Sequence, residues 1–551
     1  MGLNLDIGSS DFKIVSKADY YVDKTAMLIP LMERCQSGSS LIFNRPRRFG
    51  KSLALSMMET FFSDSTIDAL SYFKDRAVMK ADITPHLSQY KVIRLSFSDV
   101  SEDPSFDTKG YLKRKIAEIY RSFYPYFEKQ KLSNDEIESY QRIMRIEDDE
   151  TSYMFALKRL SELIHREHGK KPIVLIGEYD LLLEKRGVDD GADFYKAILT
   201  SLLKDNEHLG MGILTGVFSL AKGSLSSGLN NIPVDNGIVS LIDKNYFGFE
   251  EEDVSFLLSR YGRKSEEINL LKEYYGGYCF NEKEYFNPWS IVSYLNTGVL
   301  MGYWVDSARK EAFYSLVEKM DDEGFRTIDS LMQGEEIIRQ LDFTISYENY
   351  LDSTDNILLY LAMAGYLSIR QVSFTEFSIS ITNKETLSAF SSLFYHSYKD
   401  KEGLNKAREL RKAFIEGDAK KIAEILESFL LSALSYYDFS NEKTYQIMVG
   451  TLASIVLEDY LVRHEVIAGE GRCDILIAPR EKKDFGAVIE LKNFSERKSK
   501  QRLESSAMTA LKRIQKKGYA APLISLGVKE IYGYGIAFYK NRVAVISKKL
   551  V

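Results

Sequence analysis

Short apolar runs alternate with amphipathic stretches over residues 39–217. The runs have the length of strands, and the stretches between them carry apolar residues three and four positions apart, as one face of a helix does. The run at residues 173–176 is apolar throughout and ends in acidic residues, which is typical of a buried parallel strand. Strands that alternate with helices indicate a parallel α/β sheet. The expected strands are residues 39–43, 92–97, 173–176 and 211–217, and the expected helices are residues 53–62, 111–124 and 154–167.

The pattern changes from residue 250 onward, where short helical segments and many tyrosines replace the strand–helix alternation. Residues 330–440 are expected to be mostly helical, and the stretch KAFIEGDAKKIAEILESFLLSAL predicts a pair of amphipathic helices. From residue 441 the expected order is one helix, three short strands and a second helix. The expected elements of this last part are a helix at residues 445–460, strands at 468–478 and 485–492, and a helix at 505–517.

Composition narrows the class of protein. A chain of 551 residues is too long for one hydrophobic core and is expected to form about three or four domains. The net charge of −6 excludes a globally basic nucleic-acid binder but leaves room for a local basic groove. Cys35, Cys279 and Cys473 lie too far apart for a disulfide framework or a metal-ligand motif, which fits a reducing compartment. No run approaches the roughly 18 apolar residues of a membrane helix, and the N-terminal stretch has no signal-peptide core, so we expect a cytoplasmic protein without a membrane partner.

The stretch RPRRFGKSL, residues 45–53, lies between an expected strand and an expected helix. Gly50, Lys51 and Ser52 fill the last three places of the phosphate loop G-x-x-x-x-G-K-[ST]. Arg45 stands where the first glycine of that motif would be. In such a loop the lysine reaches the β- and γ-phosphates and the serine hydroxyl binds Mg²⁺, while the helix N-terminus favours the anion. The strand before the loop and the helix after it favour a nucleotide site over the alternative, a basic surface turn.

Acidic residues after the run at 173–176 form the second part of that site. A P-loop enzyme needs one strand-end carboxylate near Mg²⁺ and usually another that orients the attacking water. Glu178 is placed for the water, but Gly177 stands where the metal-side acid would be, and Asp180 is the candidate substitute. Thr215 is placed as a sensor of the γ-phosphate or the water. The alternatives are a solvated strand end and an ordinary strand threonine. Loss of the metal-side acid weakens hydrolysis more than binding, so the sequence predicts nucleotide binding more firmly than turnover.

A second candidate site lies in GEGRCDILIAPREKKDFGAVIELKNF. Asp474 is on one expected strand, and Glu490 and Lys492 share one face of the next because strand side chains alternate. In a hairpin the two acids can hold one or two Mg²⁺ ions, which lower the pKa of a bound water. The lysine can orient that water or neutralise developing charge. The alternative is a solvated hairpin with a surface ion pair.

Residues around these three support a nuclease site. Gln515 and Tyr519 are one helical turn apart in the stretch QKKGY, as in a motif of many nucleases of this type, so Gln515 is a further catalytic candidate. Glu442 and Glu458 are candidates for an additional acid, although each can equally be a solvated helix residue. Basic residues suit either a nucleic-acid track or a charged surface helix. They are Lys492, Arg497, Lys498, Lys500, Arg502, Lys512, Arg513, Lys516 and Lys517.

Successive motifs along nearly the whole chain resemble those of the bacterial AAA-ATPase-like family with a C-terminal PD-(D/E)XK nuclease-like domain. These motifs are RPRRFGKSL, VLIGEYD, LTGVFSLAKGSLSSGLNN, YYGGYCFNEKEYFNPWS and YWVDSARKE. The family pattern carries an acid where this chain has Gly177. The resemblance implies that the arginine-rich loop binds ATP and Mg²⁺. The residues so implied are Arg45, Arg47, Arg48, Phe49, Gly50, Lys51, Ser52 and Leu53, with Ser52, Asp474 and Glu490 as metal ligands.

The expected architecture is α/β and multidomain. It comprises an AAA-like P-loop domain at residues 1–248, a winged-helix-like lid at 249–335, a helical connector at 336–438 and a restriction-endonuclease-like α/β domain at 439–551. The function we expect is a nucleotide-regulated, Mg²⁺-dependent nuclease acting on nucleic acid, DNA in preference to RNA. The alternatives are a hydrolysis-deficient switch that only binds nucleic acid or a protein, and an ATP-driven remodelling machine. The last of these would be a homo-oligomeric ring, and Gly177 speaks against it.

Overall fold

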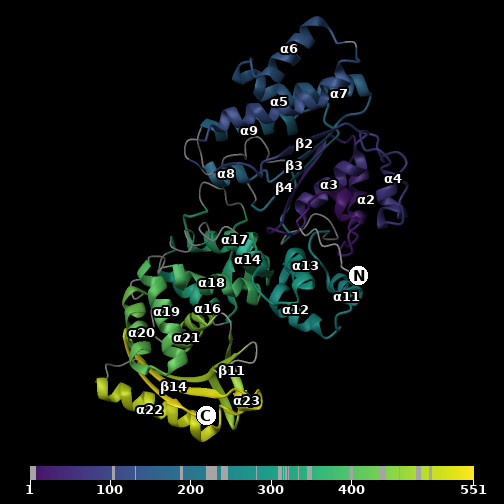
Figure 1. Cartoon of the computed structure of the whole chain (residues 1–551). Coiled ribbons are helices and arrows are strands. Elements are labelled where there is room, and N and C mark those ends of the chain that lie inside the picture. Colours follow the sequence, from purple (N-terminus) through teal and green to yellow (C-terminus); the bar gives the residue numbers. More distant parts are fainter. Residues whose placement is uncertain are drawn as a thin grey trace. The chain divides into compact units, whose positions relative to one another are not determined.

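The computed structural model divides the chain into two compact units (Figure 1). The first unit joins Met1–Arg309 to Ile338–Thr386, and the second joins Lys310–Ile337 to Leu387–Val551. Of the helices that the structure describes, none is both long and apolar enough to cross a membrane. The structure describes residues 8–551 except 102, 104–105, 131, 187–189, 219–231, 238–245, 281, 308–312, 314–315, 317–318, 321, 333, 344–349, 397–400, 434–441, 458–459, 480–484 and 495–498.

A five-stranded parallel sheet with the order β2-β3-β4-β1-β5 lies at the centre of the first unit. The four expected strands are confirmed to within one or two residues, and only the two-residue β5 was missed. Helix α3 follows the phosphate loop, and α5 and α7 follow β2, as expected. The strands are β1 (Ser39–Asn44), β2 (Val92–Ser96), β3 (Ile173–Gly177), β4 (Met211–Gly216) and β5 (Val234–Asp235), and the helices are α3 (Lys51–Phe62), α5 (Thr108–Phe127), α7 (Glu150–His168), α8 (Leu181–Arg186) and α9 (Asp190–Leu203).

Strand β3 is apolar throughout because the sheet is covered on both faces. Ile173 and Leu175 pack into a core with α3, whereas Val174 and Ile176 pack into a second core with α5, α7 and α9. Figure 1 shows α3 on one side of the strands and α5 and α9 on the other. The carboxyl ends of the parallel strands are therefore left as the edge at which a ligand can bind.

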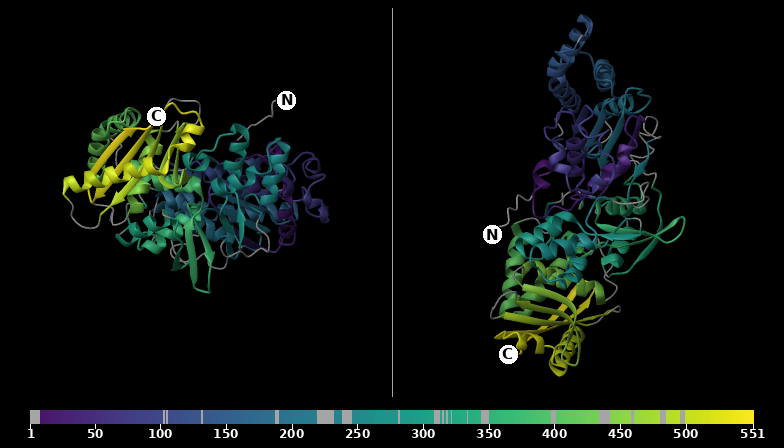
Figure 2. Two further views of the ribbon diagram at one scale, coloured as in Figure 1. Left: turned by 90° about the horizontal axis from the view of Figure 1, so that it is seen from below. Right: turned by 90° about the vertical axis from the view of Figure 1, so that its right-hand side faces the viewer.

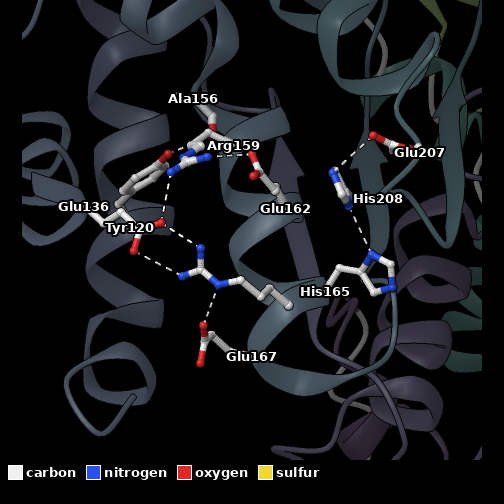
Figure 3. A network of polar contacts seen from close by, with 10 residues as sticks. Tyr120, Glu136, Ala156, Arg159, Glu162, His165, Glu167, Glu207 and His208 are labelled. Carbon is white, nitrogen blue, oxygen red and sulfur yellow. Dashed lines mark hydrogen bonds and ion pairs between the residues drawn. The ribbon is translucent and has the colours of Figure 1, made fainter. Parts of the chain in front are cut away.

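A helix that the sequence reading did not identify, α6 (Asn134–Arg145), joins α5 to α7. Its N-terminus is a capping box, in which Ser133 and Glu136 each bond the other's backbone N–H. Glu136 also accepts both terminal nitrogens of Arg166 on α7, at 2.7 and 3.2 Å (Figure 3). This hydrogen bonding lowers the pKa of Glu136 to about 2. The network fixes the helical arm formed by α5, α6 and α7.

The segment after the sheet contains short helices and a two-stranded hairpin that share a core of their own. Residues 337–381 hold a further three-stranded sheet with the order β8-β10-β9. The expectation that the connector at 336–438 is mostly helical is therefore wrong over this stretch, because its strands are too short to show a clear alternation. The elements are α11 (Glu251–Arg260), α12 (Glu267–Tyr275), β6 (Tyr278–Phe280), β7 (Lys283–Tyr285), α13 (Pro288–Thr297), α14 (Tyr303–Ser307), β8 (Ile337–Gln340), α17 (Thr354–Ala364), β9 (Leu367–Gln371) and β10 (Glu376–Ile381).

The second unit is built on a five-stranded sheet in sequence order, β11-β12-β13-β14-β15, in which only β13 and β14 are parallel. The expected order of helix, three strands and helix is confirmed. The boundaries differ: Gly469 and Glu470 turn between two strands that we had read as one, and Tyr460 begins a strand instead of ending a helix. The elements are α19 (Lys401–Glu416), α20 (Ala419–Ala433), α21 (Glu442–Val456), β11 (Tyr460–Ala468), β12 (Gly471–Pro479), β13 (Phe485–Asn493), α22 (Lys500–Lys517), α23 (Ala521–Ser525), β14 (Glu530–Tyr539) and β15 (Arg542–Lys549).

Strand β14 shows how the two faces of this sheet are covered. Tyr532 and Tyr534 point to one face, where the Tyr534 hydroxyl donates to the carbonyl of Phe414 on α19. Gly533 and Gly535 point to the other face and allow α22 to approach closely, since a Cβ at Gly535 would lie 1.9 Å from a backbone oxygen of α22. Figure 2 shows α22 lying along one face of the yellow strands and the green helices along the other.

Candidate nucleotide and metal sites

The phosphate loop connects β1 to α3 at the carboxyl edge of the first sheet. Gly50 precedes α3 in a left-handed conformation with φ of 84°, which glycine adopts without strain. Lys51 is the first residue of α3, and its buried Nζ donates to the loop carbonyls of Arg45 and Pro46 at 2.9 and 2.8 Å. Burial lowers the pKa of Lys51 to about 8. The lysine thus lies inside the turn of the loop, as a phosphate-binding lysine must.

Arg45 has a structural role inside the loop. Its guanidinium forms an ion pair with Asp235 at 2.7 Å, and both side chains are only 1% exposed. The same group donates to the backbone carbonyls of Asn44 and Asp235, and it lies over the rings of Phe247 and Phe280. The expectation that the Arg45 side chain contacts nucleotide is therefore wrong, because its donors are already committed to β5 and the loop.

The next three residues of the loop point in different directions. Arg47 forms an ion pair with Glu184 on α8 at 2.9 Å. Arg48 has a φ of 66° and lies over the ring of Trp289 at the start of α13, 4.6 Å from its centroid. Phe49 is buried, and it packs against aromatic residues of β6 and β7. The arginines that the sequence leaves undifferentiated thus divide into a buried support and two cavity-facing groups.

A cavity of about 480 Å³ opens beside the phosphate loop, a volume typical of small-molecule sites. Most of the expected loop residues meet there: Arg47 to Leu53 all line the cavity, and so does Glu178. The sequence reading missed the rest of the lining. It comes from the N-terminal segment, the lid and the loop before α11, and includes Ser9, Tyr20, Val22, Tyr246, Phe247, Phe249, Pro288, Trp289 and Val292.

The acidic residues of the first site differ in what they can offer a ligand. One carboxylate oxygen of Glu178 is buried and accepts no hydrogen bond from any residue that the structure describes. An unsatisfied acceptor beside the exposed Ser52 fits a Mg²⁺-bound nucleotide. Asp180 accepts the backbone N–H groups of Val217 and Phe218, both at 2.7 Å, so it secures the end of β4 and does not replace the acid missing at Gly177.

Thr215 and Gly177 lie level with one another in neighbouring strands. Thr215 is only 1% exposed, and it is not among the described residues that line the cavity. The sensor role expected for Thr215 therefore gains no support from its position. A Cβ at Gly177 would meet Leu55 at 3.4 Å and Ser96 at 3.7 Å, so the site has room for a side chain there.

The second site is on β12 and β13 of the second unit. Leu476 pairs with Val488 in the antiparallel ladder, so Asp474 comes level with Glu490 on the same face. The Asp474 carboxylate accepts the backbone N–H of Leu491 at 2.7 Å, which places it between Glu490 and Lys492. The structure therefore brings together the three residues that the sequence reading had grouped.

Glu490 is fully buried and forms an ion pair with Arg513 on α22, at 2.6 Å. Sequence reasoning had placed Arg513 only in a basic track, and no spacing signal connects it to a residue 23 positions earlier on a strand. The relation expected for Gln515 and Tyr519 is wrong: α22 ends at Lys517, and Gly518 turns the chain so that Tyr519 is buried while Gln515 is exposed. Gln515 stays only a prediction. Glu458, Arg497, Lys498 and the side chain of Glu442 lie outside the described residues.

Comparison with known proteins gives two family matches. Residues 6–226 match the family described as predicted AAA-ATPase, and residues 440–548 match the PD-(D/E)XK nuclease superfamily. The chain joins an AAA-ATPase-like domain to a PD-(D/E)XK nuclease-like domain. The phosphate loop, Glu178 and Thr215 lie in the first match, and Asp474, Glu490 and Lys492 lie in the second. This confirms the P-loop and restriction-endonuclease-like folds predicted from the sequence.

Individual relatives are more distant. The chain is 28% identical over 387 residues to an "uncharacterized protein in vnfD 5′region" of Azotobacter chroococcum mcd 1. That alignment covers 67% of this chain and 64% of the relative's length. Among solved structures, a Walker-type ATPase of Pyrococcus abyssi has a TM-score of 0.37 at 14% identity, covering 67% of this chain and 94% of its own. The ORC2 protein of Aeropyrum pernix has a TM-score of 0.30 at 10% identity, covering 71% and 94%.

The nuclease-like domain offers two carboxylates for a cation. Among the residues that the structure describes, no group of three or more His, Cys, Asp or Glu side chains could hold a metal ion. Asp474 and Glu490 are nevertheless hard oxygen ligands of the kind that Mg²⁺ and Mn²⁺ accept together with waters. Glu490 is buried and already compensated by a cation, Arg513, so this position suits positive charge. The residues present therefore fit a divalent ion.

Proposed function

We propose that this protein is a nucleotide-regulated, divalent-metal-dependent nuclease that cleaves phosphodiester bonds in nucleic acid. One observation carries the proposal: the Asp474 carboxylate is fixed on the N–H of Leu491, between Glu490 and Lys492. Two acids and a lysine on one sheet face are what metal-assisted phosphodiester hydrolysis requires. A solvated hairpin, the alternative from the sequence, would not bury Glu490 completely.

Each residue of the nuclease-like site has a distinct role in this proposal. Asp474 and Glu490 would hold a divalent cation, which when bound supplies a water of lowered pKa and neutralises charge on the phosphate. The N–H of Leu491 keeps the Asp474 carboxylate in one orientation. Lys492, on the same face as Glu490, orients the attacking water or stabilises the negative charge that develops on the phosphate oxygens. Burial of Glu490 limits competition from bulk water.

The AAA-ATPase-like domain would bind ATP and control the nuclease. Lys51 and the N-terminus of α3 bind the phosphates, while Ser52 and Glu178 would hold Mg²⁺. Turnover is slow in this proposal, because Gly177 supplies no carboxylate and Asp180 is occupied by backbone N–H groups. ATP therefore acts as a slowly hydrolysed ligand that sets the state of the protein.

The nucleic acid would contact the exposed side of α22. Lys500, Arg502, Lys512 and Lys516 are all exposed on this helix. A row of basic side chains beside the acidic site can bind the phosphate backbone without reading sequence, and we propose DNA as the polymer. A second candidate function, binding without cleavage, is favoured by the Arg513–Glu490 pair, which occupies one of the two acids.

The proposal is tested by the effect of nucleotide on cleavage of labelled DNA in Mg²⁺. A non-hydrolysable ATP analogue should change the cleavage rate of the wild-type protein, and Lys51→Ala should remove this response. Lys74→Ala, which changes an exposed lysine outside the cavity, is the matched control and should keep the response. Binding is followed separately through Trp289, which lines the cavity. An analogue that changes Trp289 fluorescence but not cleavage would contradict nucleotide regulation.

A further inference from the structure

Arg513 holds Glu490 in the position that a divalent cation would take. The two side chains meet at 2.6 Å, and they differ in exposure: Glu490 is 0% exposed, whereas Arg513 is 49% exposed. A buried carboxylate without a compensating cation is strongly unfavourable. In the metal-free protein the guanidinium therefore provides the positive charge that Glu490 requires.

The approach of Arg513 to Glu490 is built into the packing of α22 on the sheet. Glu490 pairs with Gly535 in the parallel ladder of β13 and β14. A Cβ at Gly535 would lie 1.9 Å from the carbonyl oxygen of Ala507 and 2.7 Å from the N atom of Leu511, so only glycine permits this helix position. Leu511 and Ile514 are buried in the core beneath the helix, on either side of Arg513 in sequence. The pair thus results from a tightly constrained helix and is not a chance surface contact.

Arg513 also has a route away from Glu490. Its side chain is half exposed, and the neighbouring Lys512 and Lys516 are exposed on the same helix. A guanidinium binds phosphate oxygens as well as carboxylates, with two parallel hydrogen bonds. When a cation takes its place at Glu490, Arg513 can turn to the phosphate of a polymer lying along α22.

We propose that Arg513 is a gate residue that competes with the divalent cation for Glu490 and is released to the substrate phosphate when the cation binds. This inference rests on the proposed nuclease function and specifies how its metal site is regulated. Occupancy of the ion pair lowers the apparent metal affinity by the fraction of molecules in which Glu490 is free. A pair that is formed in about 90% of molecules would weaken metal binding by about tenfold.

The test measures Mn²⁺ binding to the full chain by electron paramagnetic resonance, without substrate or nucleotide. Arg513→Gln removes the competing charge and should bind Mn²⁺ about tenfold more tightly than the wild type. Lys512→Gln removes the same charge one position away, and its affinity should stay within about twofold of the wild type. Asp474→Asn identifies the signal from this site, because binding there should disappear.

A second readout covers the loss of stability expected when Glu490 loses its partner. Mn²⁺ should raise the melting temperature of Arg513→Gln more than that of the wild type, because the cation replaces the missing charge. Arg513→Lys keeps a cation and should behave like the wild type. Equal Mn²⁺ affinities for the wild type and Arg513→Gln, with binding lost in Asp474→Asn, would overturn the gate but leave the proposed nuclease site intact. Absence of binding in every protein would overturn both.

Discussion

The Arg45–Asp235 pair provides a quantitative test of how the phosphate loop is held. Arg45→Met leaves Asp235 as a buried charge, since both side chains are 1% exposed. Breaking a buried ion pair by removing one partner costs about 3–5 kcal/mol in free energy of unfolding. The double variant Arg45→Met/Asp235→Leu removes both charges and should regain most of that loss, because apolar replacements of a buried pair are often neutral.

The chain offers a selective assay for this prediction. It contains two tryptophans, Trp289 and Trp304, and both belong to the first unit, so tryptophan fluorescence in urea follows that unit alone. With a urea dependence of about 3 kcal/mol per molar, the midpoint should fall by about 1–2 M in Arg45→Met. A loss below about 1 kcal/mol, together with a large and selective loss of ATP affinity, would show that Arg45 binds nucleotide and would refute the structural role.

Three further predictions concern single positions. Gly177→Asp restores a strand-end acid where a Cβ lies 3.4 Å or more from its neighbours, so ATP hydrolysis measured by phosphate release should rise by about 10–100-fold; an unchanged rate would contradict the role given to this glycine. Because burial lowers the pKa of Lys51 to about 8, its ammonium loses its proton as pH rises through that value, and ATP affinity measured by Trp289 fluorescence should be constant below pH 7 and fall above pH 8 by up to about tenfold per unit. Lys51→Arg should abolish that fall, and a flat wild-type profile would disprove the assignment. Gly535→Ala should destabilise the second unit by about 1–3 kcal/mol in calorimetry, since its Cβ would lie 1.9 Å from a helix carbonyl; full stability would show that α22 can move.

The strands that form the first sheet could be predicted because each is a compact apolar run next to an amphipathic helix. Residues 173–176 are the clearest case, since burial on both faces makes every position apolar. The sheet at 337–381 could not be predicted in this way. Its strands are four to six residues long, and exposed positions interrupt their alternation, as in β8, where intermediate and exposed residues follow one another.

The candidate sites could be predicted as far as their chemistry lies in local sequence. Gly50, Lys51 and Ser52 are adjacent, and the spacing of Glu490 and Lys492 is fixed by the strand period, so both groups were identified correctly. The roles of Arg45 and Arg513 depend on partners 190 and 23 positions away, and only tertiary packing brings them together. The expected relation of Gln515 and Tyr519 failed because Gly518, in a left-handed conformation, ends the helix between them.

Single-turnover cleavage of DNA in Mg²⁺ by the wild type and by Asp474→Asn tests the central claim most directly. The account predicts that the wild-type protein cleaves and that Asp474→Asn, which alters the carboxylate held by the N–H of Leu491, reduces the rate by about a hundredfold or more. Equal cleavage by both proteins, or no cleavage of any DNA or RNA by the wild type, would contradict it.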